Sequence, residues 1–173
     1  MMSQYFELDL KAVLVPYDTS EFSENALEYA VYLAKAIFLG DSKKQIIKIM
    51  ILHIIQEIPF TKTILDKIKS NRNNEKLSLS EHARSIYDET KISIEKDIDE
   101  KKKLYKSIDG IEIDSTILYG DPSNQIIDYT KKNRVDLIVM GSNGLQGLAK
   151  IRGLGSVSRK VSEAVSCPMT IIR

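Results

Sequence analysis

A glycine-rich stretch directly after an apolar run constrains this chain more than any other feature. The run Leu137 to Met140 is short and continuously apolar, which is typical of a strand buried on both faces of a sheet. Five of the eight glycines of the chain follow between Gly141 and Gly155. Because glycine costs backbone entropy, such a dense cluster indicates a loop whose backbone approaches a ligand closely. A surface loop that is merely rich in glycine is the alternative interpretation.

A helix is expected directly after these glycines. Val157, Val161 and Val165 recur at helical spacing, and Ser156 is expected to be the N-cap residue of this helix. The start of a helix presents free N–H groups and a positive dipole end to an anion, commonly phosphate. The stretch therefore predicts a phosphate-binding loop between a strand and a helix.

Two familiar phosphate motifs do not fit this loop. It has no Gly-Lys-Ser or Gly-Lys-Thr ending, which excludes a Walker A loop. Gly153 and Gly155 are followed by Ser158 where a dinucleotide-binding fingerprint requires a third glycine.

Strand-like and helix-like segments alternate along the whole chain. Strands are expected at Ala12–Val15, Ile46–Ile55, Ile111–Ile117, Leu137–Met140 and Cys167–Ile172. Helices are expected from the N-cap Ser20 to Gly40, from Leu79 to Tyr105, from Pro122 after the N-cap Asp121, and after the glycine loop. Such alternation predicts an α/β fold with an open, five-stranded parallel sheet and helices on both faces.

Length and composition limit the possible classes of protein. The 173 residues suit one domain, residues 1–173, in which the polar segment 58–76 is expected to be a flexible insertion or flap. A net charge of +1 gives no electrostatic reason to expect a nucleic-acid or membrane partner. Cys167 is the single cysteine and no signal peptide is apparent, so a reducing cytoplasm is expected.

No catalytic or metal-binding group stands out in the sequence. His53 lies within an apolar strand without a cysteine, histidine or carboxylate cluster, which favours a hydrogen-bonded core residue. Cys167 lacks an evident base partner, which favours a structural thiol. No paired carboxylates or nucleophile–base set is evident, so we assign no catalytic residue.

The motif Gly141-Ser-Asn-Gly144, a spacer and Gly155-Ser156-Val157 resembles the nucleotide-binding signature of the universal stress proteins. That signature is Gly, two residues, Gly, nine residues, Gly, and Ser or Thr. Ten residues, Leu145 to Leu154, form the spacer in this chain. Three further segments resemble the family: Val15-Pro-Tyr-Asp-Thr-Ser, Ile51-Leu-His-Ile and Gly120-Asp-Pro.

The resemblance implies the strand order 3-2-1-4-5 and an adenine nucleotide, ATP or AMP with or without Mg²⁺, as cofactor. It places Asp18 near the ribose, Ile54 beside the adenine and Gly120 beside the sugar. Further ligand-binding positions are implied at the strand ends and around the phosphates, namely Pro16, Met140, Gly141, Ser142, Gly144, Gly155, Ser156 and Val157.

The resemblance further implies a homodimer formed through the C-terminal strand, together with unknown protein partners. The hypothesis is therefore a nucleotide-binding regulatory protein of the stress response, without a dedicated catalytic apparatus. Three alternatives stay open. They are a dimer that binds no nucleotide, a slow ATPase that depends on a divalent metal, and a nucleotidyl-transfer or ATP-pyrophosphatase enzyme of related architecture.

Overall fold

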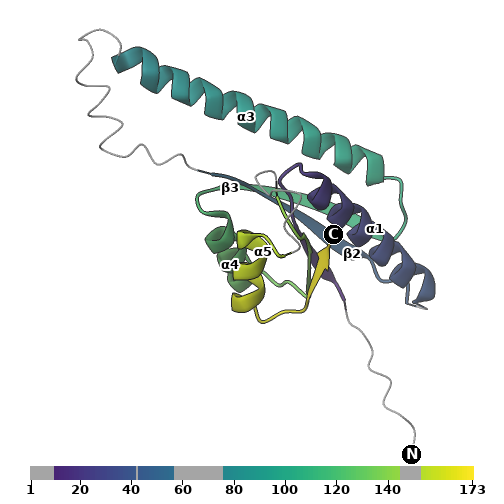
Figure 1. The fold of residues 1–173 in the computed structure, drawn as a ribbon. Helices are drawn as coiled ribbons and strands as arrows, with labels where there is room; N and C mark the ends of the chain where they lie inside the picture. Colours follow the sequence, from purple (N-terminus) through teal and green to yellow (C-terminus); the bar gives the residue numbers. More distant parts are fainter. Residues whose placement is uncertain (1–9, 42, 57–75, 145–152) are drawn as a thin grey trace, which may run out of the picture.

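The computed structural model describes residues 10–41, 43–56, 76–144 and 153–173. In this part of the chain, strands and helices alternate (Figure 1). The strands are β1 (Ala12–Pro16), β2 (Ile47–Ile55), β3 (Ile111–Tyr119), β4 (Leu137–Gly141) and β5 (Met169–Ile172). The helices are α1 (Glu21–Gly40), α3 (Lys76–Tyr105), α4 (Pro122–Lys132) and α5 (Ser156–Ala164).

The five strands form one parallel sheet in the order β3-β2-β1-β4-β5, which confirms the predicted fold class and strand order. β1 lies at the centre and is buried throughout, because it has a neighbour on each side and helices above and below. The alternating pattern of β3 belongs to an edge strand, as its sequence predicts.

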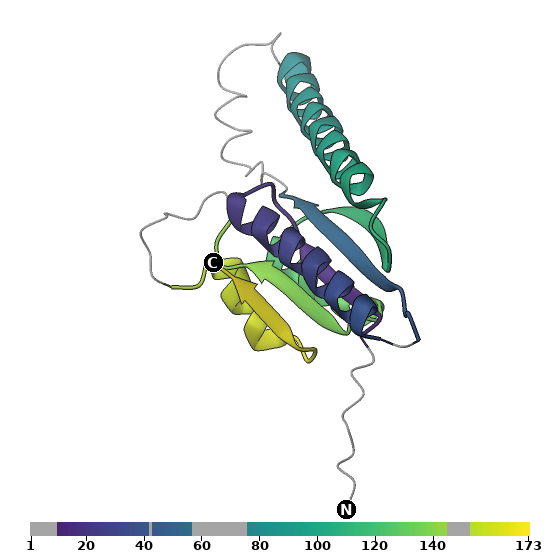
Figure 2. The same ribbon diagram turned by 90° about the vertical axis from the view of Figure 1, so that its right-hand side faces the viewer.

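The sheet carries helices on both faces. α1 and α3 lie on one face and α4 and α5 on the other, and the N-terminal half of α3 extends beyond the sheet (Figures 1 and 2). Each face has its own hydrophobic core. The first core joins Val13, Val15, Ile49 and Val139 to Leu27, Ala30 and Ile98 of the helices. The second joins Leu14, Leu52 and Ile138 to Ile126 and Val161.

Two of the three predicted helix caps are confirmed. The Ser20 side chain accepts a hydrogen bond from the Ser23 N–H, and the Asp121 side chain accepts one from the Asn124 N–H. The predicted cap at Ser156 is wrong, because the N-cap of α5 is Gly155, which has no side chain to make a capping hydrogen bond. Gly155 has extended backbone angles, and Ser156 is already the first helical residue.

Element boundaries differ slightly from those predicted. β3 continues to Tyr119, because its pairing with β2 extends to Ile55. β5 begins at Met169 rather than at Cys167, and Pro168 directly before it has no N–H to donate to a ladder. The predicted insertion 58–76 lies outside the described residues apart from Lys76, the first residue of α3.

Candidate functional site

The candidate site lies where β1 and β4 end side by side. β1 pairs with β4 on one side, through Val13–Leu137 and Leu14–Ile138. The next strand along the chain, β2, pairs with β1 on its other side. The strand order therefore reverses between β1 and β4. Open α/β sheets bind ligands in the crevice beyond the carboxyl ends of the strands at this point.

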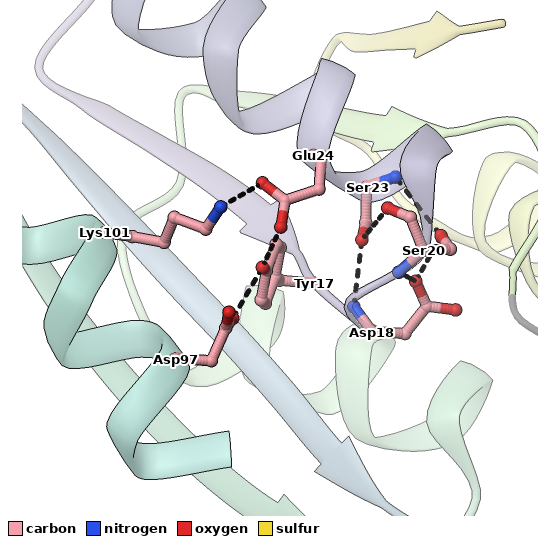
Figure 3. Close-up of polar contacts among 7 residues, drawn as sticks. All are labelled: Tyr17, Asp18, Ser20, Ser23, Glu24, Asp97 and Lys101. Carbon is pink, nitrogen blue, oxygen red and sulfur yellow. Dashed lines mark hydrogen bonds and ion pairs between the residues drawn. The ribbon is translucent and has the colours of Figure 1, made fainter. Parts of the chain in front are cut away.

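The turn after β1 presents Asp18 at this edge. Asp18 Oδ1 accepts hydrogen bonds from the Ser20 hydroxyl at 2.5 Å and from the Ser20 N–H at 3.2 Å. The Asp18 N–H donates to Ser23 Oγ at 3.3 Å. Thr19, between Asp18 and Ser20, has a φ of 66°, which costs a residue with a Cβ about 1–2 kcal/mol. The hydrogen bonds therefore hold Asp18 in a strained turn (Figure 3).

The first two glycines of the motif lie where an added Cβ would collide with neighbouring atoms. A Cβ on Gly141 would lie 2.8 Å from both the backbone carbon and the Cβ of Phe22, so α1 packs directly on the end of β4. A Cβ on Gly144 would collide with Asp18 Oδ2. The glycine loop and the turn after β1 thus approach each other at Gly144 and Asp18.

The second half of the motif, which begins at Gly155, is hydrogen-bonded to the first half at Ser142. The Gly155 N–H donates to the Ser142 carbonyl at 2.8 Å, and the hydroxyl of buried Ser158 lies 2.9 Å from the same oxygen. The Ser142 N–H in turn donates to the Ile172 carbonyl at 2.7 Å, which fixes the start of the loop to β5. The ten-residue spacer thus brings Gly155 back to Ser142; its residues 145–152 lie outside the described part of the chain.

The start of α5 also faces this region. Ser156 is exposed and Val157 is half-buried, and the N-cap residue Gly155 has no side chain to cap the first N–H groups of the helix. Uncapped N–H groups at the positive end of the helix dipole favour an anion. The positions Gly155, Ser156 and Val157 therefore combine a close backbone approach with anion-binding groups.

The other predicted ligand-binding residues line the same carboxyl edge of the sheet. Ile54 is half-buried near the end of β2 and packs, like Val157, against the core on the α4 and α5 face. Gly120 follows β3 with a φ of +126°, and its N–H donates to the Ile55 carbonyl at 3.0 Å. Pro16 and Met140 are both buried, so their side chains belong to the protein interior.

His53 is a hydrogen-bonded core residue, as predicted. It is 7% exposed, and its Nδ1 lies 2.7 Å from the Tyr17 carbonyl oxygen. Burial lowers the pKa of His53, against the opposing effects of the Tyr17 carbonyl and the nearby carboxylates of Asp18 and Asp97. The neutral ring with a proton on Nδ1 therefore anchors the residue that precedes Asp18.

Tyr17 has a role that the sequence did not indicate. Its side chain is buried, and its hydroxyl lies 2.5 Å from Glu24 Oε1 of α1 and 2.6 Å from Asp97 Oδ2 of α3 (Figure 3). Burial, with the hydrogen bonds to Asp97 and Glu24, raises the pKa of Tyr17 far above its ordinary value. The hydroxyl is therefore neutral, and its single proton is donated to one of the two carboxylates at a time. Lys101 Nζ completes the cluster at 2.7 Å from Glu24 Oε2.

Fold and site together define a class: an α/β protein with a glycine-rich loop at the reversal point of a parallel sheet. A model of the universal stress protein family matches residues 10–173, and the chain belongs to that family. Universal stress protein YxiE of Bacillus subtilis is 33% identical over 164 residues, which cover 93% of this chain and 97% of that protein.

Solved structures have the same fold. Universal stress protein UspA from Lactobacillus plantarum superposes with a TM-score of 0.72 at 21% identity, covering 94% of this chain and 97% of that one. Protein MJ0577, a universal stress protein of Methanocaldococcus jannaschii, gives a TM-score of 0.69 at 25% identity and covers 94% of both chains.

Two structurally similar proteins contain adenine nucleotides. One is a universal stress protein in complex with cAMP, with a TM-score of 0.54 at 20% identity, covering 95% of this chain and 97% of that one. The other is an Arabidopsis thaliana universal stress protein with AMP bound, with a TM-score of 0.52 at 19% identity, covering 94% and 90%.

Two kinds of feature are absent from the described residues. Within 10–41, 43–56, 76–144 and 153–173, no helix is long and apolar enough to cross a membrane. The same ranges contain no group of three or more His, Cys, Asp or Glu side chains arranged to hold a metal ion.

Proposed function

We propose that this protein binds an adenine nucleotide, ATP or AMP, beyond the carboxyl ends of β1 and β4. The observation that carries the proposal is the convergence of Asp18, Gly144 and Gly155. A Cβ on Gly144 would displace the Asp18 carboxylate, and Gly155 is hydrogen-bonded to Ser142, two positions before Gly144. An acidic group and two close-approach glycines thus surround one point at the sheet edge where such folds bind ligands.

The phosphate groups are the part of the ligand that the glycine loop suits best. Gly141, Ser142 and Gly144 start the loop, and Ser156 and Val157 open α5 with uncapped N–H groups. Backbone N–H groups at a helix start bind phosphate without a basic side chain. Mg²⁺, where it accompanies ATP, would be held chiefly by phosphate oxygens and water.

The nucleoside is assigned to the same edge on the β2 and β3 side. Asp18 is the acceptor for ribose hydroxyl groups, as a carboxylate binds vicinal hydroxyls through its two oxygens. Half-buried Ile54 and Val157 offer apolar surface for the adenine, and the backbone at Gly120 borders the sugar. The cAMP and AMP complexes of structurally similar proteins support an adenine nucleotide.

The proposed role is regulation by ligand binding rather than chemical turnover. A nucleotide that contacts both the turn after β1 and the glycine loop would order both and shift the population of the bound conformation. The proposed location is the cytoplasm, where Cys167, the single cysteine, stays reduced.

Calorimetric titration of nucleotide-free protein with ATP tests the proposal through matched glycine variants. Gly144→Val drives a side chain into the Asp18 carboxylate, and Gly155→Val brings a Cβ within 3.1 Å of the Ser142 carbonyl oxygen. Both variants are expected to lose at least about tenfold in ATP affinity, because more than about 1.4 kcal/mol of binding energy is removed. Gly40→Val is the control, because a Cβ added at Gly40 would meet no atom within 4 Å.

Circular dichroism shows whether each variant is folded. Wild-type affinity in both folded loop variants would exclude the glycine loop from the site. Release of ADP during the titration would instead identify a slow ATPase.

We further propose that two copies associate through β5. β5 pairs with β4 on one side only and forms an edge of the sheet, where its outer backbone groups are available to another strand. Pairing with a second β5 would bury this edge and join two sheets into one.

A further inference from the structure

One buried tyrosine connects the long helix α3 to the turn that presents Asp18. Tyr17 is 2% exposed, and its backbone is fixed to β2 on both sides. Its N–H donates to the Leu52 carbonyl at 2.9 Å, and its carbonyl accepts from His53 Nδ1 at 2.7 Å. Any shift of the Tyr17 backbone would therefore break hydrogen bonds in the core and move the next residue, Asp18.

The Tyr17 side chain links α1 to α3 through a series of polar contacts. The hydroxyl contacts Glu24 of α1 and Asp97 of α3, and Lys101, one turn after Asp97, pairs with the second oxygen of Glu24 (Figure 3). Lys101 and Glu24 are only 22% and 27% exposed at their side chains, so water screens this pair little. We name the four residues the Tyr17 cluster.

The Tyr17 cluster attaches a part of α3, residues 87–105, that has few buried apolar side chains. Among the described side chains of this helix, residues 87–105, Ile98 is the one that is buried. Ile94 and Tyr105 pack partly against the same core, whereas Ile92 and Leu104 are both 64% exposed. A helical segment with so few apolar contacts opens more readily than a core element, so the docking of residues 87–105 can act as a two-state element.

The turn beside Tyr17 needs to be held in place. Thr19 is β-branched and has a positive φ, so the turn is strained between Asp18 and Ser20. Tyr17 fixes the turn at one end, and the Ser20 cap of α1 fixes it at the other. Without the Tyr17 cluster, this end of the turn would be held only by the backbone hydrogen bonds to Leu52 and His53, and we expect the Asp18 carboxylate to move away from Gly144.

We infer that docking of α3 onto Tyr17 positions Asp18 for the nucleotide, so that α3 docking and nucleotide binding are coupled. The inference rests on the proposed function. Tyr17 is a positioning residue here, because it acts through Asp18 rather than through contact with the ligand. Coupling of this kind is reciprocal. Bound nucleotide stabilises the docked position of α3, and any partner that releases α3 from Tyr17 lowers the affinity for nucleotide.

ATP titrations of full-length wild-type protein and three α3 variants test the coupling. Asp97→Ala removes the α3 contact of Tyr17, and we expect the ATP affinity to fall at least about fivefold. Asp97→Asn keeps an oxygen that accepts from the Tyr17 hydroxyl and is expected to restore binding to within about twofold of the wild type. Asp99→Ala removes the same charge from an exposed position on the same helix, and its affinity should also stay within about twofold.

Hydrogen exchange separates positioning from general destabilisation. Saturating ATP is expected to slow amide exchange across residues 87–105 in the wild type and in Asp99→Ala, but not in Asp97→Ala. Tyr17→Phe keeps the buried ring and removes the hydroxyl, so it should reproduce the Asp97→Ala loss. The double variant Tyr17→Phe/Asp97→Ala should lose no more affinity than Tyr17→Phe alone, because the contact between Tyr17 and Asp97 is already absent from Tyr17→Phe.

The outcomes distinguish this inference from the proposed function. If wild-type protein binds ATP and Asp97→Ala matches Asp99→Ala in affinity and α3 exchange, the coupling is wrong and the proposed function stands. If wild-type protein binds no ATP, the proposed function fails and the coupling fails with it.

Discussion

At the scale of single residues, the site depends on contacts that leave no spare room. Gly144 faces Asp18 so closely that even alanine would displace the carboxylate, and Gly141 lies against the backbone of α1 at Phe22. Both close approaches are possible because glycine has no Cβ. A side chain at Gly144 should therefore act on ligand binding first, because it meets the Asp18 carboxylate, whereas a side chain at Gly141 would push against the α1 backbone and lower stability as well.

His53 predicts a pH dependence of stability. Burial keeps the pKa of His53 below its ordinary value, so the unfolded chain takes up a proton more readily than the folded one. Its contribution to stability is therefore complete above about pH 6.5, the unfolded pKa, and is lost as the pH falls through the lower folded pKa. Urea unfolding between pH 7.5 and about pH 5 should show this loss in the wild type.

His53→Asn is the comparison for that measurement. The Asn side chain retains an N–H near the position of Nδ1 for the Tyr17 carbonyl but does not titrate, so its free energy of unfolding should fall less over the same pH range. Equal slopes for both proteins would show that His53 is not the responsible group.

Some residue-scale features could be predicted from the sequence and others could not. Asp18, Gly141, Gly144 and Gly155 lie in short motifs that resemble those of the universal stress proteins, and this resemblance was the basis for assigning them to one site. The contact between Tyr17 and Asp97 joins residues 80 positions apart. No local pattern marks such a pair, because it depends on how α3 lies on the sheet.

At the scale of elements, the periodicity of the sequence predicted every strand and helix in the described ranges, whereas several boundaries needed the structure. Pro168 delays the start of β5 because it has no N–H, although the apolar run begins earlier. Ser156 looked like a cap because serine often occupies that position, but Gly155 is bonded to Ser142 and becomes the cap instead. A tertiary hydrogen bond thus shifted the helix start.

The corrected cap predicts a contrast between two serine variants. Ser20→Ala removes the side chain that accepts from the Ser23 N–H and should lower the free energy of unfolding by about 1 kcal/mol. Ser156→Ala removes an exposed hydroxyl that caps nothing and should change it by less than about 0.5 kcal/mol. Urea denaturation followed by circular dichroism measures both, and a larger loss in Ser156→Ala would restore Ser156 as the cap.

At the scale of the whole molecule, alternation of strands and helices was sufficient to predict a parallel α/β sheet, and the resemblance to the universal stress proteins supplied the strand order. Periodicity alone does not distinguish one order from another, because it describes each strand separately. The order matters for function, since it places the carboxyl ends of β1 and β4 side by side with the glycine loop between them.

The proposed dimer predicts the effect of one proline. The carbonyls of Pro168 and Ile172 accept from β4, and alternation along a strand directs the N–H of Ile171 away from β4. Ile171→Pro therefore removes an outer donor while leaving the β4 ladder intact, and light scattering should show a shift from dimer to monomer. Ile171→Ala keeps the N–H and should remain dimeric; a wild-type monomer would contradict the proposal.

Identification of nucleotide released from freshly purified protein tests the central claim most directly. Acid denaturation followed by chromatography is expected to release ATP or AMP, and the emptied protein should then bind ATP saturably in a calorimetric titration. Absence of released nucleotide together with absence of saturable binding would contradict the account, and would identify this chain as a universal stress protein whose glycine loop binds no nucleotide.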